Sequence, residues 1–87
     1  MSMYKITFTP FTNNSNAQLI TIATVVNTKT GEEYWSEPVV IDVVEGMDEA
    51  RIADIIKQKT SGFGRRVEAI ELAKTFEGLV PDPIIEV

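Results

Sequence analysis

The fold is decided by residues 18–44, QLITIATVVNTKTGEEYWSEPVVIDVV. Residues 19–26 are rich in β-branched side chains and contain neither Gly nor Pro, which favours a β-strand. Turn-forming residues follow, and Gly31 can adopt the left-handed conformation that a hairpin with a four-residue loop over residues 28–31 requires. The sequence therefore predicts an antiparallel hairpin, with a returning strand from Glu33 to Val44.

Side-chain alternation along the two strands predicts which face of the hairpin is buried. The predicted core face consists of Ile20, Ile22, Thr24, Val26, Trp35, Val39, Ile41 and Val43. The opposite face, predicted to stay in water or to dock a partner, consists of Leu19, Thr21, Ala23, Val25, Tyr34, Ser36, Val40 and Asp42. Pro38 leaves the register open, because proline in a strand indicates an edge or a bulge, and a bulge would flip Tyr34 and Trp35.

The residues before the hairpin predict one more strand. Over residues 3–11, Tyr4, Ile6 and Phe8 alternate with polar residues, which indicates a half-buried strand. Residues 12–16, TNNSN, are strong turn formers and predict a mobile loop.

The residues after the hairpin predict two helices. The first runs from about Met47 to Lys59 with Gly46 as its N-cap, and its apolar stripe consists of Ile52, Ile55 and Ile56. The second runs from about Gly64 to Glu77 and ends at Gly78. Its predicted buried face consists of Ala69, Ile70, Leu72, Ala73 and Phe76. Phe63, in the corner between the helices, is predicted to fill the core.

The last residues are apolar again. Ile84 to Val87 are predicted to form a short edge strand or to lie along a partner, because a small domain has little hydrophobic material to leave in water. The elements together predict a single α+β domain over residues 1–87. Its antiparallel sheet has three strands, or four if the tail joins it, and two helices cover one face.

The missing residue types exclude several classes of function. The chain has no Cys, which excludes disulfides and thiolate chemistry, and no His, which removes the commonest general base and metal ligand. Paired carboxylates such as Glu68 and Glu71 are most simply the solvent side of a helix. We therefore expect a protein that is not an enzyme, with no catalytic residue, metal site or cofactor.

The sequence also predicts where the protein works. It begins without the pattern of a signal peptide, and no apolar run approaches the roughly 18 residues of a membrane span. We expect a cytoplasmic protein of a host cell that does not contact the membrane.

Charge is unevenly placed along the chain, whose net charge is −5. Between residues 32 and 54, one base, Arg51, stands against eight acids: Glu32, Glu33, Glu37, Asp42, Glu45, Asp48, Glu49 and Asp54. An acidic surface attracts basic protein surfaces and repels nucleic-acid phosphate. We expect a basic protein partner and no direct binding of nucleic acid. The alternative interpretation is a surface that only keeps the protein soluble.

The corner between the two helices contains residues 61–66, SGFGRR. Backbone amides at a helix start and two guanidinium groups can hold an anion. A tight corner between helices, however, needs the same glycines and serine without any ligand.

Residues 62–70, GFGRRVEAI, carry a family resemblance. Together with the VVN turn at residues 25–27 and the order of strands before two helices, they resemble the small phage anti-CRISPR proteins that inhibit type I-F surveillance complexes. This resemblance implies a phage protein that docks on the basic backbone subunits of a CRISPR complex and blocks target DNA. The docking surface of that family lies mainly on the sheet, outside the matched segment, so the resemblance assigns no contact residue.

We predict a non-enzymatic protein-binding inhibitor, encoded by a phage, that acts on a host nucleic-acid-handling complex such as a CRISPR surveillance complex. The predicted partner-binding residues are Glu33, Tyr34, Glu37, Asp42, Arg65 and Arg66. One alternative is an assembly module that forms a homodimer or larger homo-oligomer through Ile84 to Val87. Another is binding of nucleic acid through Lys57, Lys59, Arg65 and Arg66, which the acidic remainder of the surface disfavours.

Overall fold

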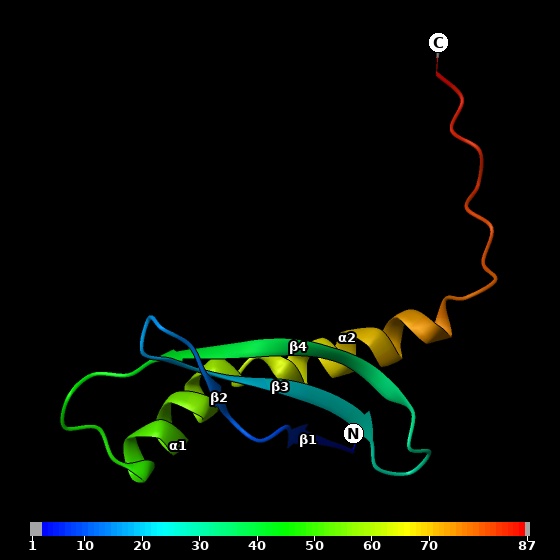
Figure 1. Cartoon of the computed structure of the whole chain (residues 1–87). Coiled ribbons are helices and arrows are strands. Elements are labelled where there is room, and N and C mark those ends of the chain that lie inside the picture. Colours follow the sequence, from blue (N-terminus) through cyan, green and yellow to red (C-terminus); the bar gives the residue numbers. More distant parts are fainter. Residues whose placement is uncertain (1–2, 87) are drawn as a thin grey trace.

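The fold is an antiparallel sheet with two helices on one of its faces (Figure 1). The computed structural model describes residues 3–86. Its strands are β1 (Tyr4–Phe8), β2 (Thr12–Asn13), β3 (Gln18–Asn27) and β4 (Glu33–Asp42), and its helices are α1 (Glu49–Lys59) and α2 (Phe63–Thr75). The predicted α+β class, with an antiparallel sheet and helices, is confirmed.

The central strand is β3, because β4 pairs with one of its sides and β1 and β2 pair with the other. The fourth strand is β2, in the segment predicted to be a loop; Thr12 and Asn13 pair with β3, so that prediction was wrong for these two residues. Between β1 and β2 the edge bulges around Pro10, which has no amide hydrogen to give to a ladder.

The hairpin loop forms as predicted. The Asn27 amide donates to the Glu32 carbonyl at 2.8 Å, which closes a loop over residues 28–31. Gly31 has a φ of 76°, the left-handed conformation expected of it.

A bulge in β4 then sets the register. Val26 pairs with Glu33, but Val25 pairs with Trp35, so Tyr34 is an extra residue on the β4 side. The bulge shifts the rest of β4 by one residue relative to β3. Both Tyr34 and Trp35 pack against the core under the helices.

The buried face of β3 is therefore the reverse of the predicted one. The residues of β3 that face the helices are Leu19, Thr21, Ala23 and Val25. The prediction was right for Trp35, Val39 and Ile41 of β4. It was wrong for the exposed Val43 and for the residues on the other side of β3, namely Ile20, Ile22, Thr24 and Val26. Alternation could not choose the face, because β3 is apolar on both sides.

Helix α1 starts two residues later than predicted. Its N-cap is Asp48 and not Gly46, since the Asp48 carboxylate accepts a hydrogen bond from the Arg51 amide at 2.9 Å. Gly46 lies in the turn before it, with a φ of 90°. The predicted stripe packs against the core and consists of Ile52, Ile55 and Ile56.

Helix α2 contacts the sheet through a different face from the predicted one. Phe63 and Val67 are buried, and Ile70 is half-buried. Phe63 fills the core as predicted, and its ring meets the edge of the Trp35 ring with the centroids 5.2 Å apart. The prediction was right for Ile70 and wrong for four exposed residues, Ala69, Leu72, Ala73 and Phe76.

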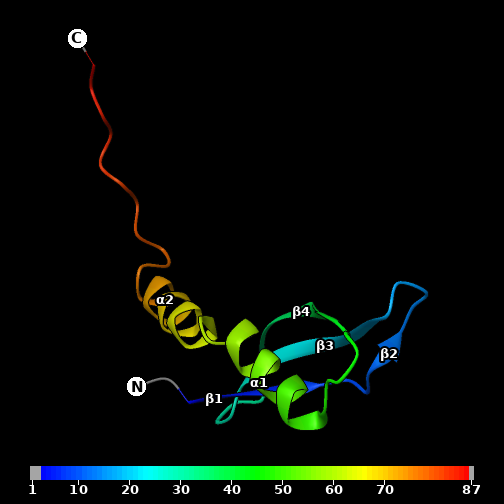
Figure 2. The same cartoon turned by 90° about the vertical axis from the view of Figure 1, so that its left-hand side faces the viewer.

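The C-terminal segment leaves the body of the fold. Residues 79–86, which we call the arm, extend away from α2 and contain no strand (Figures 1 and 2). The predicted edge strand is therefore wrong for Ile84 to Glu86, and Val87 lies outside the described residues. The radius of gyration is 18.3 Å, whereas a compact domain of this length has about 12 Å.

Candidate binding surfaces

The sheet face away from the helices carries side chains from all four strands. Its central rows consist of Ile20, Ile22, Thr24 and Val26 of β3 and of Ser36, Pro38 and Val40 of β4. On the other edge it continues through Lys5, Thr7 and Thr12. We call this surface the open sheet face. Ile22 is 38% exposed and Val40 is 37% exposed, because both helices pack on the opposite side (Figure 2).

Two predicted binding residues, Glu33 and Asp42, lie at opposite ends of the open sheet face. Glu33 shares a row with Val26 and Lys5. Asp42 shares a row with Gln18, whose Nε2 donates to its carboxylate at 2.9 Å. Both acids are exposed, so the face has an apolar middle with a carboxylate at either end.

Two other predicted residues meet on the helix side of the sheet. Arg66 Nη1 lies 3.4 Å from Glu37 Oε1, and the guanidinium group stacks over the Trp35 ring, 4.1 Å from its centroid. Trp35 Nε1 donates to the same carboxylate oxygen at 2.9 Å. The structure thus joins Glu37 and Arg66 through Trp35 and keeps them away from the open sheet face. Arg65, the next predicted residue, is exposed on α2.

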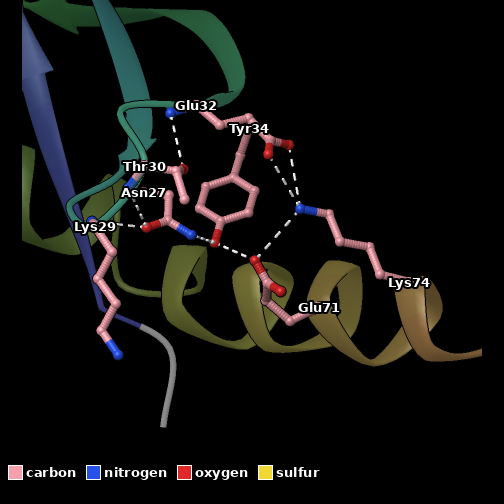
Figure 3. A network of polar contacts seen from close by, with 7 residues as sticks. All are labelled: Asn27, Lys29, Thr30, Glu32, Tyr34, Glu71 and Lys74. Atoms are coloured by element: carbon pink, nitrogen blue, oxygen red, sulfur yellow. Dashed lines mark hydrogen bonds and ion pairs between the residues drawn. The ribbon is translucent and has the colours of Figure 1, made fainter.

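Tyr34, also predicted to bind a partner, anchors α2 to the hairpin (Figure 3). Its hydroxyl group donates to the Glu71 carboxylate and accepts from Asn27 Nδ2 at 3.0 Å. Lys74 Nζ lies 3.1 Å from Glu32 Oε1 and 3.5 Å from Glu71 Oε1. This network fastens the C-terminal half of α2 to the β3–β4 hairpin.

The hydrogen bonds of this network shift the pKa values of its members. The Tyr34 hydroxyl holds the pKa of Glu71 below its usual value, and the nearby Lys74 charge acts in the same direction. The same hydrogen bond to Glu71 raises the pKa of Tyr34. The pKa of Lys74 is raised mainly by its hydrogen bond to Glu32.

Replacement of Tyr34 by Phe is expected to change how the free energy of unfolding depends on pH. A carboxylate whose pKa is lowered by folding stabilises the fold above its unfolded pKa, about 4.3, and this contribution is lost as the pH falls through the folded pKa. Between about pH 5 and pH 3, the wild-type protein should therefore lose more of its free energy of unfolding than Tyr34→Phe does. Urea unfolding at a series of pH values measures this difference.

The matched control for this substitution is Tyr4→Phe. Within residues 3–86 the Tyr4 hydroxyl takes part in no such network, although it lies close to Gly64, where an added Cβ would be 2.9 Å from it. The control should keep the acid dependence of the wild-type protein. Parallel acid profiles for the wild-type protein and Tyr34→Phe would contradict the assignment.

A groove of about 490 Å³ lies between α1 and the N-terminal edge of the sheet. Its lining consists of Phe8, Thr9, Phe11, Glu49, Ile52, Ala53 and Ile56. The lining is apolar with one carboxylate, so it offers packing area and no pair of acid and base.

In the corner at residues 61–66, two side chains that could have faced an anion bind other groups of the chain instead. Ser61 Oγ donates to the Gln58 carbonyl at 2.9 Å, and Arg66 faces Glu37. In the part of the chain that the structure describes, no group of three or more acidic side chains could hold a metal ion. No helix within that part is long and apolar enough to cross a membrane.

Sequence reasoning placed Val40 on the exposed face but missed the isoleucines of the open sheet face, because it placed Ile20 and Ile22 in the core. It also missed the exposed residues on the outer side of α2. The one signal for the first error was Pro38, which indicated an irregular β4 without saying where the bulge lies.

Comparison of the chain with protein-family models, with curated proteins and with solved structures found no match. The resemblance of residues 62–70 to anti-CRISPR proteins therefore stays a prediction.

Proposed function

We propose that this chain is a non-enzymatic inhibitor that docks its open sheet face on a basic protein surface. The observation that carries the proposal is the uncovered apolar middle of that face, where Ile22 and Val40 are more than a third exposed. Apolar side chains gathered in one patch and rimmed by polar residues are typical of protein interaction sites. The open face of a sheet suits a protein partner better than a small ligand, which needs a concave site.

The charge around the open sheet face favours a basic partner. Glu33 and Asp42 stand at its two ends and outnumber Lys5 on the same face, and the exposed Glu45 follows in the loop after β4. Carboxylates arranged around an apolar patch can engage the lysines and arginines that a nucleic-acid-handling complex uses to hold phosphate. Binding of the chain would then exclude the nucleic acid.

The most concrete partner comes from the resemblance of residues 62–70. It suggests a phage-encoded protein that docks on the basic backbone subunits of a type I-F CRISPR surveillance complex. The sheet is the main docking surface of the family that the chain resembles, which agrees with the face proposed here.

Charge reversal at both ends of the open sheet face tests this proposal. The double variant Glu33→Lys/Asp42→Lys is expected to bind a purified type I-F surveillance complex at least about tenfold more weakly than the wild-type protein, because like charges would meet at the interface. Biosensor titration of the immobilised complex measures the affinity.

The control is Asp54→Lys/Glu68→Lys, which changes the net charge equally at exposed positions on the two helices. It should bind like the wild-type protein apart from a small effect of net charge. Equal weakening by both double variants would contradict docking through the open sheet face. Absence of wild-type binding at about 10 µM would contradict this partner.

A further inference from the structure

We propose that a second copy of this chain covers the outer face of α2, so that two α2 helices pack antiparallel in a symmetric dimer. The outer face of α2 consists of Ala69, Leu72, Ala73 and Phe76, all exposed. It is separate from the open sheet face, so the dimer does not depend on the proposed function.

Helix α2 is apolar on two opposite sides. Successive residues of a helix are turned by about 100°, which places Phe63, Val67 and Ile70 on one side and centres the outer face of α2 about 140° away. The first side packs on the sheet, whereas Leu72 and Phe76 on the outer side remain 58% and 56% exposed. A surface helix of a globular protein normally carries one apolar stripe, which faces the core, so a second apolar side without cover is unusual.

The chain exposes more surface than a monomer of its size normally does. Its accessible surface is 6871 Å², whereas a monomeric protein of 9.7 kDa exposes about 5,100 Å². The excess, to which both the outer face of α2 and the arm contribute, is about 1,800 Å². The arm, where Val80, Ile84 and Ile85 are 85–87% exposed, accounts for part of this excess, so the excess does not measure the outer face of α2 alone.

The outer face of α2 is complementary to itself. About a two-fold axis between Leu72 and Ala73, antiparallel pairing places residue 69 opposite residue 76 and residue 72 opposite residue 73 of the other copy. Each pair then joins a large side chain to an alanine, Phe76 with Ala69 and Leu72 with Ala73. Alanines let two helices approach closely, and the large side chains fill the space beside them. A symmetric dimer requires such a surface.

The helix dipoles favour the antiparallel direction. The helix begins with Arg65 and Arg66, and Glu77 follows its C-terminal end. Antiparallel pairing about the same two-fold axis places Glu77 opposite Glu68 of the other copy, with Arg65 about one turn away, so these side chains do not set the direction. The helix dipoles set it, because antiparallel pairing places the positive end of one dipole next to the negative end of its neighbour.

The mass of the full chain in solution tests the dimer. Sedimentation equilibrium across a range of concentrations should give twice 9.7 kDa at high concentration. Leu72→Asp, at the centre of the pairing, should weaken association at least about tenfold, because it buries two carboxylates close together. The control Val44→Asp changes another exposed apolar residue, far from α2, and should leave the mass unchanged. A wild-type protein that stays at the mass of one chain at about 100 µM would overturn the proposal.

Crosslinking tests the direction of the helices and does not require Leu72→Asp to fold. The chain has no cysteine, so an introduced one is unique. In Ala73→Cys the thiols of the two copies face each other across the two-fold axis. In Ala69→Cys the thiols of the two copies are about 10 Å apart along the helices. A short thiol crosslinker should therefore join Ala73→Cys and leave Ala69→Cys largely unjoined. Equal crosslinking of both variants would indicate parallel helices and overturn the pairing.

Discussion

Phe63→Ala is expected to destabilise the fold by about 3–5 kcal/mol, the range for truncating a buried Phe. Phe63 is 8% exposed, and its ring packs edge-on against Trp35 where α2 begins. Among residues 3–86 the buried hydrophobic residues are few: Ala23, Val25, Val39, Ile41, Phe63 and Val67. A domain of this length has about 4–13 kcal/mol of stability in total, so the loss of this ring should leave part of the protein unfolded at room temperature.

The same substitution at the other end of α2 provides the control. Phe76 is 56% exposed, and Phe76→Ala should change the free energy of unfolding of the monomer by less than about 0.5 kcal/mol. Urea unfolding followed by circular dichroism, at concentrations too low for association, measures both variants. Equal costs at the two positions would contradict the observed orientation of α2 on the sheet.

Ile41→Ala is expected to cost about 2–5 kcal/mol, because Ile41 is 1% exposed in the middle of the core. Ile22→Ala removes the same atoms from the open sheet face, where Ile22 is 38% exposed. We expect it to cost less than about 1 kcal/mol, mainly through lower strand propensity. The pair measures which face of the sheet is buried.

The opposite order of these two costs would contradict the observed register. It would mean that the helices cover the side of β3 that carries Ile22, as alternation without the bulge predicts. Ile22→Ala has a second expected effect, weaker binding of the partner with little change in stability, which separates a docking role from a packing role.

Local signals in the sequence predicted most of the elements. The hairpin loop follows from Gly31, the strands follow from their β-branched residues, and the isoleucine spacing of α1 identifies its buried side. Each of these depends on interactions between residues close together in the chain. The position of a helix N-cap is also local, but Asp48 and Gly46 are both acceptable, and only the hydrogen bond to the Arg51 amide decides between them.

The faces of β3 and α2 could not be predicted because both elements are apolar on two sides. The choice for β3 depends on one extra residue, Tyr34, whose position in the bulge is stabilised by Glu71 from a distant part of the chain. The choice for α2 depends on Phe63 and Val67, which lie N-terminal to the predicted stripe. Both belong to the core, where the Phe63 ring meets Trp35. The residues wrongly assigned to the core are those that remain available on the surface.

The position of the bulge in β4 also decides which of the candidate binding residues could be predicted. Glu33 and Asp42 lie where a partner could reach them on the open sheet face. Tyr34 lies in the bulge and binds Glu71, and Glu37 lies on the same side of β4 as Trp35 and binds Arg66. A sequence without a known bulge position could not separate these two pairs.

The most direct test of the central claim is competition between this chain and labelled target DNA for a purified type I-F surveillance complex. We expect the chain, at a few times the concentration of the complex, to prevent DNA binding, and Glu33→Lys/Asp42→Lys to require at least about tenfold more protein for the same effect. DNA binding that is unchanged by a large excess of the chain would contradict the claim.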